Sequence, residues 1–122
     1  MGGVRYPTVE NAYQAAKTVN VGDRIKISVM SPRDAKHYGR KVKLWRDWED
    51  LKLEIMKGLI KQKFTIPVLR KKLLATGRRE LIEGNYWGDT FWGVCNGRGY
   101  NYLGRLLMEV RKEIKDIEKL KA

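Results

Sequence analysis

The chain has 122 residues, of which 43% are hydrophobic and 33% are charged. This composition predicts one soluble globular domain over residues 1–122 and excludes a disordered chain or a membrane span, because no apolar run is long enough to cross a bilayer. The net charge of +12, from 26 Lys and Arg against 14 Asp and Glu, favours a polyanionic partner such as a nucleic acid or a phosphorylated small molecule. Richness in Lys and Glu is also typical of adaptation to high temperature, so charge alone does not identify the partner.

The chain contains one cysteine, Cys95, and one histidine, His37. One cysteine cannot form an internal disulfide, and the residues after Met1 lack the apolar core of a secretory signal, so we expect a cytoplasmic protein. A single His and a single Cys supply no ligand cluster, so we expect no metal and no cofactor.

The first predicted helix begins after Thr8, which is placed to cap it, and ends near Lys17. Glu10, Tyr13, Gln14 and Lys17 follow the spacing i, i+3, i+4, i+7, where a surface helix normally carries the apolar residues that it buries. Small residues on the adjacent stripe would let the helix lie close to a neighbour. We therefore expect a functional site on the polar face, with an exposed helix that carries scattered charges as the alternative.

Proline and glycine divide the middle of the chain into further elements. Residues 25–29 alternate between apolar and polar, as in a short strand or extended turn. Ser31-Pro32 then starts a short helix that ends near Gly39. Apolar residues at helical spacing predict a longer helix from Asp47 to about Lys61.

The last third of the chain begins with a helix that Pro67 opens and that Gly77 is placed to end. Leu81-Ile82 predicts a short, buried extended piece. The final helix begins near Asn101, and its apolar residues are alternately four and three apart, which favours packing against the domain or a partner helix. Together the elements predict a mainly α fold of four or five helices with at most one or two short extended segments.

A second concentration of chemical groups lies in residues 83–93, where Asp89 stands among aromatic residues and glycines. Aromatic walls can stack a flat base, and Asp89 can hydrogen-bond a ribose or act as an acid or base. The alternative is that Phe91 and Trp92 only anchor the loop onto the core. The glycine-rich residues 93–101 lead into the last helix, where backbone N–H groups can receive a phosphate, although such a segment is more often just a turn.

These residues resemble the NADAR (YbiA-like) domain family over nearly the whole chain. The run from Tyr6-Pro-Thr-Val-Glu10 through Asn-Ala-Tyr-Gln14-Ala-Ala-Lys17 is similar to the first motif of the family. The further motifs follow in the same order as in the family: Pro32-x-x-Ala35-Lys36, the Trp48 helix with Ile55-Met56, Lys63-Phe64, Leu73-Leu-x-Thr76-Gly77, Leu81-Ile-Glu83, Asp89-x-x-Trp92-Gly93, Asn101-x-Leu103-Gly104 and Leu107-Met-x-Val-Arg111.

The resemblance implies a compact multi-helix orthogonal bundle and N-glycosidase activity, the hydrolysis of a C–N bond at the anomeric carbon of a ribose. The transition state of this reaction has oxocarbenium character, which carboxylates stabilise and an acid at the leaving nitrogen assists. The resemblance assigns these catalytic roles to Glu10 and Asp89. Lys17 is a candidate nucleophile, which would form a Schiff base with the anomeric carbon of an opened sugar.

The resemblance also implies substrate contacts, namely stacking of the leaving base, orientation of the sugar, and binding of ribose or phosphate. Trp48 and Trp92 would stack the base, Gln14 would orient the sugar, and Asn101 would bind ribose or phosphate. Tyr13 and Gly93 are the other substrate-binding residues that we expect.

Two substrates fit the resemblance: ADP-ribosylated guanine in nucleic acid, and phosphorylated ribosylamino-pyrimidine intermediates of riboflavin biosynthesis. Members of the family usually begin with a further aromatic-rich segment that is absent before Tyr6, which implies a more open site or one completed by a partner. The basic charge favours the nucleic acid. The alternatives are a non-catalytic module that binds ADP-ribose or nucleic acid, and a helical interaction protein that dimerises through the last helix, so monomer and homodimer both stay open.

Overall fold

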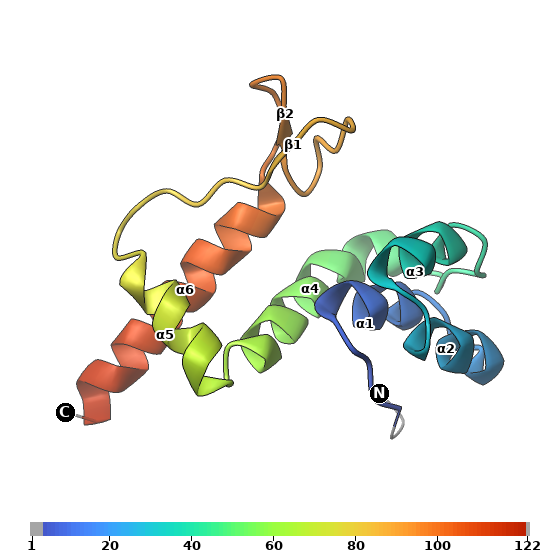
Figure 1. The fold of residues 1–122 in the computed structure, drawn as a ribbon, viewed down its shortest axis with the longest axis horizontal. Coiled ribbons are helices and arrows are strands. Elements are labelled where there is room, and N and C mark those ends of the chain that lie inside the picture. The colour runs from blue at the N-terminus through green and yellow to red at the C-terminus, as the bar shows by residue number, and fades with distance from the viewer. Residues whose placement is uncertain (1–3, 122) are drawn as a thin grey trace. The chain divides into compact units, whose positions relative to one another are not determined.

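The computed structural model describes residues 4–121, and within that range it is mainly α-helical, with six helices and one pair of very short strands (Figure 1). The contacts gather into two compact units, one up to Leu59 and one from Ile60 onward. Each unit is described by itself below, and the single domain over residues 1–122 stays a prediction. No helix among the described residues is both long and apolar enough to cross a membrane.

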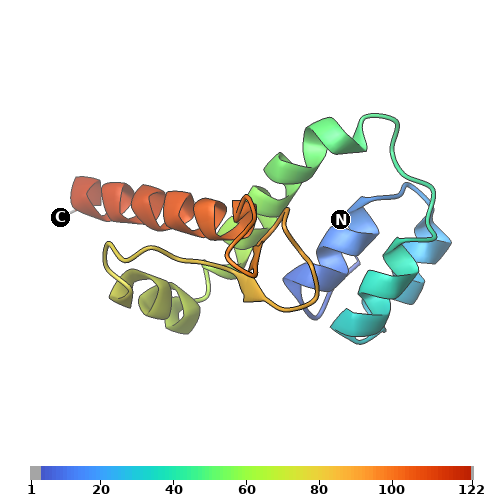
Figure 2. The same cartoon turned by 90° about the horizontal axis from the view of Figure 1, so that it is seen from above.

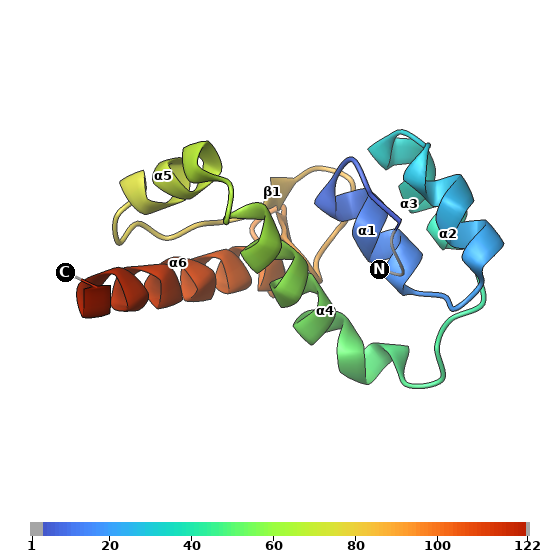
Figure 3. The same cartoon turned by 90° about the horizontal axis from the view of Figure 1, so that it is seen from below.

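The first unit is built around three short helices, α1 (Val9–Ala16), α2 (Val21–Ser28) and α3 (Pro32–Gly39), which lie side by side in Figures 2 and 3. The residue before each helix caps it, because the side chains of Thr8, Asn20 and Ser31 each accept a hydrogen bond from the backbone N–H three residues later. One side chain from each helix forms the centre of the packing. These residues are Ala15, Ile27 and Ala35, all 0% exposed.

The helix α2 replaces the strand or extended turn predicted for residues 25–29. Within this helix only Ile27 is buried, whereas Ile25 is 52% exposed and Val29, which follows the helix, is 84% exposed. The alternation therefore did not mark a buried face of a strand. The cap from Asn20 and the favourable position of Asp23 in the first turn support a helix instead.

Asn11 ties α1 to the end of α2. Its side-chain Nδ2 donates to the carbonyl oxygens of Ile27 and Met30, both at 2.9 Å, and its Oδ1 accepts from the hydroxyl of Thr8. The residue is 0% exposed, so these bonds satisfy a polar group that would otherwise be costly to bury.

The helix α4 (Trp48–Lys63) begins and ends within two residues of the predicted bounds, and the division between the two units falls inside it. The segment before α4 is fixed to the end of α1 by Trp45. The backbone N–H of Trp45 donates to the carbonyl of Lys17 at 2.9 Å, and its indole N–H donates to the carbonyl of Ala16 at 3.0 Å. Both carbonyls belong to the open C-terminal end of a helix, which needs such donors.

In the second unit α5 (Pro67–Ala75) and α6 (Tyr102–Lys121) lie side by side (Figures 2 and 3). The helix α5 begins at Pro67 as predicted, and Gly77 follows its end with a φ of +65°. Two side chains of α6 donate to groups just beyond the end of α5. Arg111, 6% exposed, bonds the Thr76 hydroxyl at 2.7 Å, and Lys115 bonds the Gly77 carbonyl at 2.8 Å.

The strand β1 (Gly84–Asn85) pairs in parallel with β2 (Val94–Cys95). The approach of the two segments requires glycine, because a Cβ on Gly93 would lie 2.2 Å from the carbonyl oxygen of Glu83. Leu81-Ile82 precedes β1 in non-helical backbone, as predicted, but the predicted burial is wrong for Ile82, which is 57% exposed.

Candidate functional site

The helix α1 brings four predicted site residues together on one face. The amide Nε2 of Gln14 donates to the Glu10 carboxylate at 3.5 Å, and the ammonium nitrogen of Lys17 lies 5.5 Å from the centre of the Tyr13 ring. Tyr13 is 5% exposed and Gln14 is 3% exposed. The alternative of a solvated helix with scattered charges is therefore wrong.

Lys17 supplies the positive charge of this face, and its surroundings shift its pKa. Burial lowers the pKa of Lys17 below its ordinary value of 10.5, and the positive charges of Arg40 and Lys52 act in the same direction. The carboxylates of Glu10 and Glu49 oppose this shift in pKa. A lysine with a lowered pKa has a larger fraction of neutral amine, which is the nucleophilic form.

Gln14 is held against α3 by the absence of a side chain at Gly39. A Cβ on Gly39 would lie 1.9 Å from Oε1 of Gln14, so any larger residue would have to displace the amide. The oxygen Oε1 is buried and has no hydrogen-bond partner in the described part of the chain. A buried acceptor without a donor is costly in a folded protein, and a donor from a ligand or a water would remove that cost.

Trp48 supports this face from the start of α4. Its ring centre lies 5.3 Å from that of Tyr13, with the planes tilted by 55°. Trp48 is only 4% exposed, so it positions Tyr13 rather than offering an open stacking surface.

In the second unit, the polar side chains predicted for the site form hydrogen bonds with the backbone of their own loop. One carboxylate oxygen of Asp89, Oδ1, accepts from the backbone N–H groups of Phe91 at 3.1 Å and Trp92 at 2.9 Å. The side chain of Asn85 brackets the backbone of Asp89, since its Oδ1 accepts from the Asp89 N–H and its Nδ2 donates to the Asp89 carbonyl. Asp89 therefore shapes the loop as an Asx turn does.

Asn101 is also committed to the backbone. Its side chain accepts from the N–H of Glu83 and donates to the carbonyl of Leu81, both at 2.9 Å, and the residue is 8% exposed. Its φ of +54° lies in the left-handed region, which Asn tolerates better than most residues. In this structure Asn101 positions residues 81–83 and Gly93 permits their close approach.

Trp92 belongs to a chain of ring contacts rather than to an isolated wall. Phe91 packs edge-on against Trp92 with centres 4.8 Å apart, and it also contacts Tyr102 at 4.8 Å. The rings of Tyr100 and Tyr102 stack at 5.4 Å, and Arg105 lies 5.5 Å from the centre of the Tyr102 ring. Packing by Phe91 and Trp92, the alternative raised from the sequence, is therefore present.

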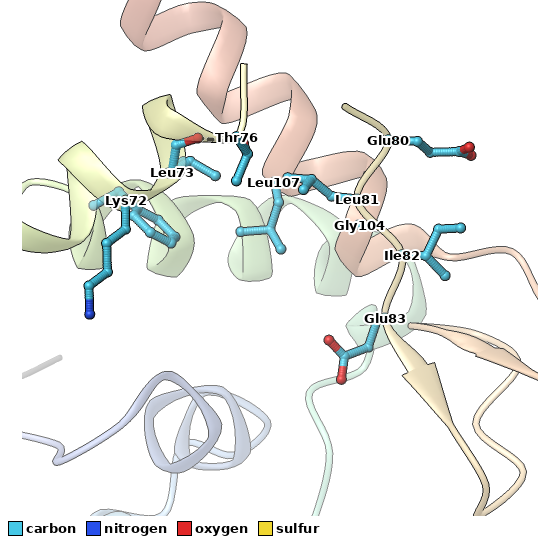
Figure 4. Close-up of a pocket in the computed structure, with 10 residues that line it drawn as sticks. Lys72, Leu73, Thr76, Glu80, Leu81, Ile82, Glu83, Gly104 and Leu107 are labelled. Carbon is cyan, nitrogen blue, oxygen red and sulfur yellow. Dashed lines mark hydrogen bonds between the residues drawn. The ribbon is translucent and has the colours of Figure 1, made fainter. Parts of the chain in front are cut away.

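An open pocket of about 500 Å³ lies in the second unit, and sequence reasoning did not single it out as a site (Figure 4). Its walls come from α5, α6, residues 80–83, Phe64 just after α4 and Thr76 just after α5. Five of the motifs that carry the family resemblance contribute to it, namely those that contain Phe64, Leu73 and Thr76, Leu81 and Glu83, Gly104, and Leu107. Membership of these motifs was the one signal that could have identified the pocket, since nothing in their local spacing does. No cluster of metal-ligating side chains is present in residues 4–121.

The family model described as NADAR domain matches residues 1–115. An N-glycosidase of Nostoc punctiforme is 39% identical over 92% of this chain and 76% of its own length. The NMR structure of YbiA from E. coli is similar with a TM-score of 0.85 and 37% identity, over 96% of this chain and 71% of that one.

Two longer relatives carry names from riboflavin biosynthesis. The chloroplastic riboflavin biosynthesis protein PYRR of Zea mays is 41% identical over 89% of this chain. A riboflavin biosynthesis protein of Vibrio vulnificus is 37% identical over 95% of this chain. The chain spans only 20% of the Zea mays protein and 33% of the Vibrio vulnificus protein.

Proposed function

The chain belongs to the NADAR domain family, and from this premise we propose that it is an N-glycosidase, a hydrolase that cleaves the C–N bond between a ribose and a nitrogen base. Relatives named as N-glycosidases support this activity. The observation that carries the proposal is the partly buried ammonium of Lys17, whose pKa is lowered, on the same helix face as the Glu10 carboxylate.

The proposed reaction uses Lys17 as the nucleophile. Its neutral amine attacks the anomeric carbon, and the electron pair of the C–N bond passes to the base nitrogen, which takes up a proton from an acid. The nitrogen of Lys17 then loses a proton, and its electron pair forms the C=N bond of a protonated Schiff base as the bond from the anomeric carbon to the ring oxygen breaks and that oxygen takes up a proton. Water adds to this bond, restores the amine of Lys17 and releases the sugar.

The remaining residues of α1 support this step. We assign the proton donor role to Glu10, which also stabilises positive charge that develops on the sugar. Gln14, with its unpartnered Oε1, accepts a hydrogen bond from a sugar hydroxyl, and Tyr13, backed by Trp48, forms the wall beside Lys17.

The residues of the second unit receive narrower roles. Asp89 is the less suitable acid or base, because one of its oxygens already accepts two backbone N–H groups. We propose that Asp89, Gly93 and Asn101 keep their loop in shape for substrate binding and that Trp92 provides a stacking surface there.

Two substrate classes are proposed, both ribosyl compounds. The names of the relatives from riboflavin biosynthesis favour a phosphorylated ribosylamino-pyrimidine. The net charge of +12 favours ADP-ribose attached to guanine in a nucleic acid. We place the activity in the cytoplasm, which agrees with the buried free thiol of Cys95.

The proposal is tested by mass spectrometry of products from both substrates, with wild type and the Glu10→Gln variant. Release of the free base and the sugar by wild type alone is the expected result, and the substrate that is cleaved identifies the class. In a parallel reaction borohydride reduces the Schiff base to a stable secondary amine, and peptide mapping is expected to locate the added mass on Lys17.

Two results would overturn the proposal. Tight binding of a substrate without any release would indicate a non-catalytic binding module. Release that continues in the Lys17→Met variant, without a trapped adduct, would exclude Lys17 as the nucleophile and leave direct attack by water.

A further inference from the structure

The pocket of the second unit combines apolar walls with one polar end. Phe64, Leu73, Leu81 and Leu107 supply the apolar surface, and Gly104 adds a stretch of backbone without a side chain. A Cβ on Gly104 would lie 2.1 Å from the carbonyl of Leu81, so no side chain can fill the pocket from that position. An apolar cleft with a few well-placed polar groups is the usual form of a small-molecule site.

The polar end is the carboxylate of Glu83. Its backbone is fixed on both sides, because its N–H donates to Asn101 at 2.9 Å and its carbonyl accepts from Val94 at 2.8 Å. The carboxylate points toward the opening of the pocket in Figure 4. It makes no hydrogen bond or ion pair with any other described residue, although basic side chains greatly outnumber acidic ones in this chain.

Glu80 provides a contrast three residues earlier. Its side chain is exposed, and its carboxylate points away from the pocket in Figure 4. Lys72 extends along the opposite side of the opening from Glu83. The pocket thus has one carboxylate, that of Glu83, which faces its interior next to the apolar walls.

We propose that this pocket binds a planar nitrogen heterocycle whose adjacent N–H donors face the carboxylate of Glu83. Two carboxylate oxygens match two parallel donors, such as a ring N–H beside an exocyclic amino group, and the flat ring covers the apolar walls. The ligand class rests on the proposed function, because the base of a ribosyl substrate such as guanine or a 2-aminopyrimidin-4-one carries this pair of donors.

Binding of a free base, which needs no turnover, tests the proposal on the whole chain. The probe is isocytosine, which presents a ring N–H beside an amino group, and the comparison probe is pyrimidin-4-one, which lacks the amino group. Two-dimensional NMR of ¹⁵N-labelled protein follows each titration. We expect isocytosine to shift the amide signals of Glu83, Gly104 and Leu107 and to bind about tenfold more tightly than pyrimidin-4-one.

Two isosteric variants provide the decisive comparison. Glu83→Gln is expected to weaken isocytosine binding about tenfold or more, because an amide cannot accept two hydrogen bonds from parallel donors. Glu80→Gln is the matched control, and the affinity of this variant is expected to equal that of wild type. Retained thermal unfolding transitions confirm that both variants are folded.

The outcomes separate this inference from the proposed function. Equal loss in the two variants, equal affinity for the two probes, or no shift of pocket signals would each overturn the pocket assignment. None of these results bears on hydrolysis, which is measured independently on the ribosyl substrates. Absence of hydrolysis together with selective binding of isocytosine would reject the enzyme and retain the pocket.

Discussion

The polar side chains of α1 and those of the loop between β1 and α6 differ in what satisfies them. On α1 the oxygen Oε1 of Gln14 is buried without a partner, and the pKa of Lys17 is lowered chiefly by burial. In the loop, Oδ1 of Asp89 and Oδ1 of Asn101 accept hydrogen bonds from backbone N–H groups. Polar side chains of the same types therefore either bond to the backbone or keep their polar atoms unbonded. Only the second kind can bind a ligand without breaking a bond of the fold.

Replacement of Lys17 is expected to have the largest effect on the α1 site. We expect Lys17→Met to lower kcat by at least about 10³-fold, since loss of a nucleophile removes the central step of the reaction. The folded state should not lose stability, because an apolar side chain replaces an ammonium that burial disfavours. Single-turnover kinetics and thermal unfolding measure the two effects. Activity above a tenth of wild type would reject the role of Lys17.

Replacement of Glu10 and of Asp89 by the corresponding amides tests whether the two carboxylates have different roles. Glu10→Gln is expected to lower kcat about 10²-fold or more with little change in stability, because it removes an acid and keeps the shape. Asp89→Asn keeps an oxygen that can accept from Phe91 and Trp92, so we expect kcat to fall less than about tenfold and stability to fall by about 1 kcal/mol. Kinetics and urea unfolding of both variants distinguish chemistry from loop structure. The opposite order of the two effects on kcat would reverse the assignment.

Asn101→Ala is expected to act on stability. It leaves the Glu83 N–H and the Leu81 carbonyl without partners and places alanine at a φ of +54°, which together should cost about 3 kcal/mol. Asn96→Ala is the matched control, because Asn96 has a similar φ of +52° and is exposed. The difference between the two losses in urea unfolding isolates the hydrogen bonds. Equal losses would mean that the bonds of Asn101 contribute nothing beyond backbone conformation.

The lowered pKa of Lys17 predicts how activity depends on pH. In the Glu10→Gln variant no acid titrates beside Lys17 and only the neutral amine attacks, so the residual kcat/KM should rise about tenfold per pH unit below the pKa of Lys17 and level off before 10.5. The same shift sets how stability changes with pH. Between the pKa of Lys17 in the folded protein and its ordinary value of 10.5, the unfolded chain binds more protons than the folded one. Wild type should gain stability relative to Lys17→Met as pH rises through that interval. Rate and denaturation profiles over pH 6–10 test both statements, and a flat rate profile would contradict them.

Gly39→Ala tests whether the space beside Gln14 matters for substrate binding. Its Cβ would lie 1.9 Å from Oε1 of Gln14, so the amide must move, and we expect KM to rise a few-fold with a loss of about 1–3 kcal/mol in stability. Gly58→Ala on α4 is the matched control, since a Cβ there meets nothing within 4 Å. That variant should gain about 0.5–1 kcal/mol from helix propensity. An unchanged KM in Gly39→Ala would remove Gln14 from substrate binding.

The sequence predicted the elements whose ends carry local chemical signals. Ser31-Pro32, Pro67 and Gly77 act within one turn of the residues that they punctuate, so the helices beside them were placed well. The helix α2 was missed because Ile25, Ile27 and Val29 alternate like a strand, and only tertiary packing decides which of them is buried.

The same limit applies to the two halves of the predicted site. The grouping of Glu10, Gln14 and Lys17 follows from helix periodicity alone. The use of Asp89 and Asn101 by the backbone depends on loop conformation, which residue types do not determine. The orientation of Glu83 into a pocket depends on α5 and α6 together, and no local pattern predicts it.

The bonds that hold α1 in place join residues close together in the chain. Asn11 reaches carbonyls 16 and 19 residues away, and the indole of Trp45 reaches one 29 residues away. Closing such short loops costs little chain entropy, so we expect α1, α2 and α3 to assemble rapidly. During synthesis these helices leave the ribosome before α6 does. The face that carries Lys17 would then form while α6 is still being translated.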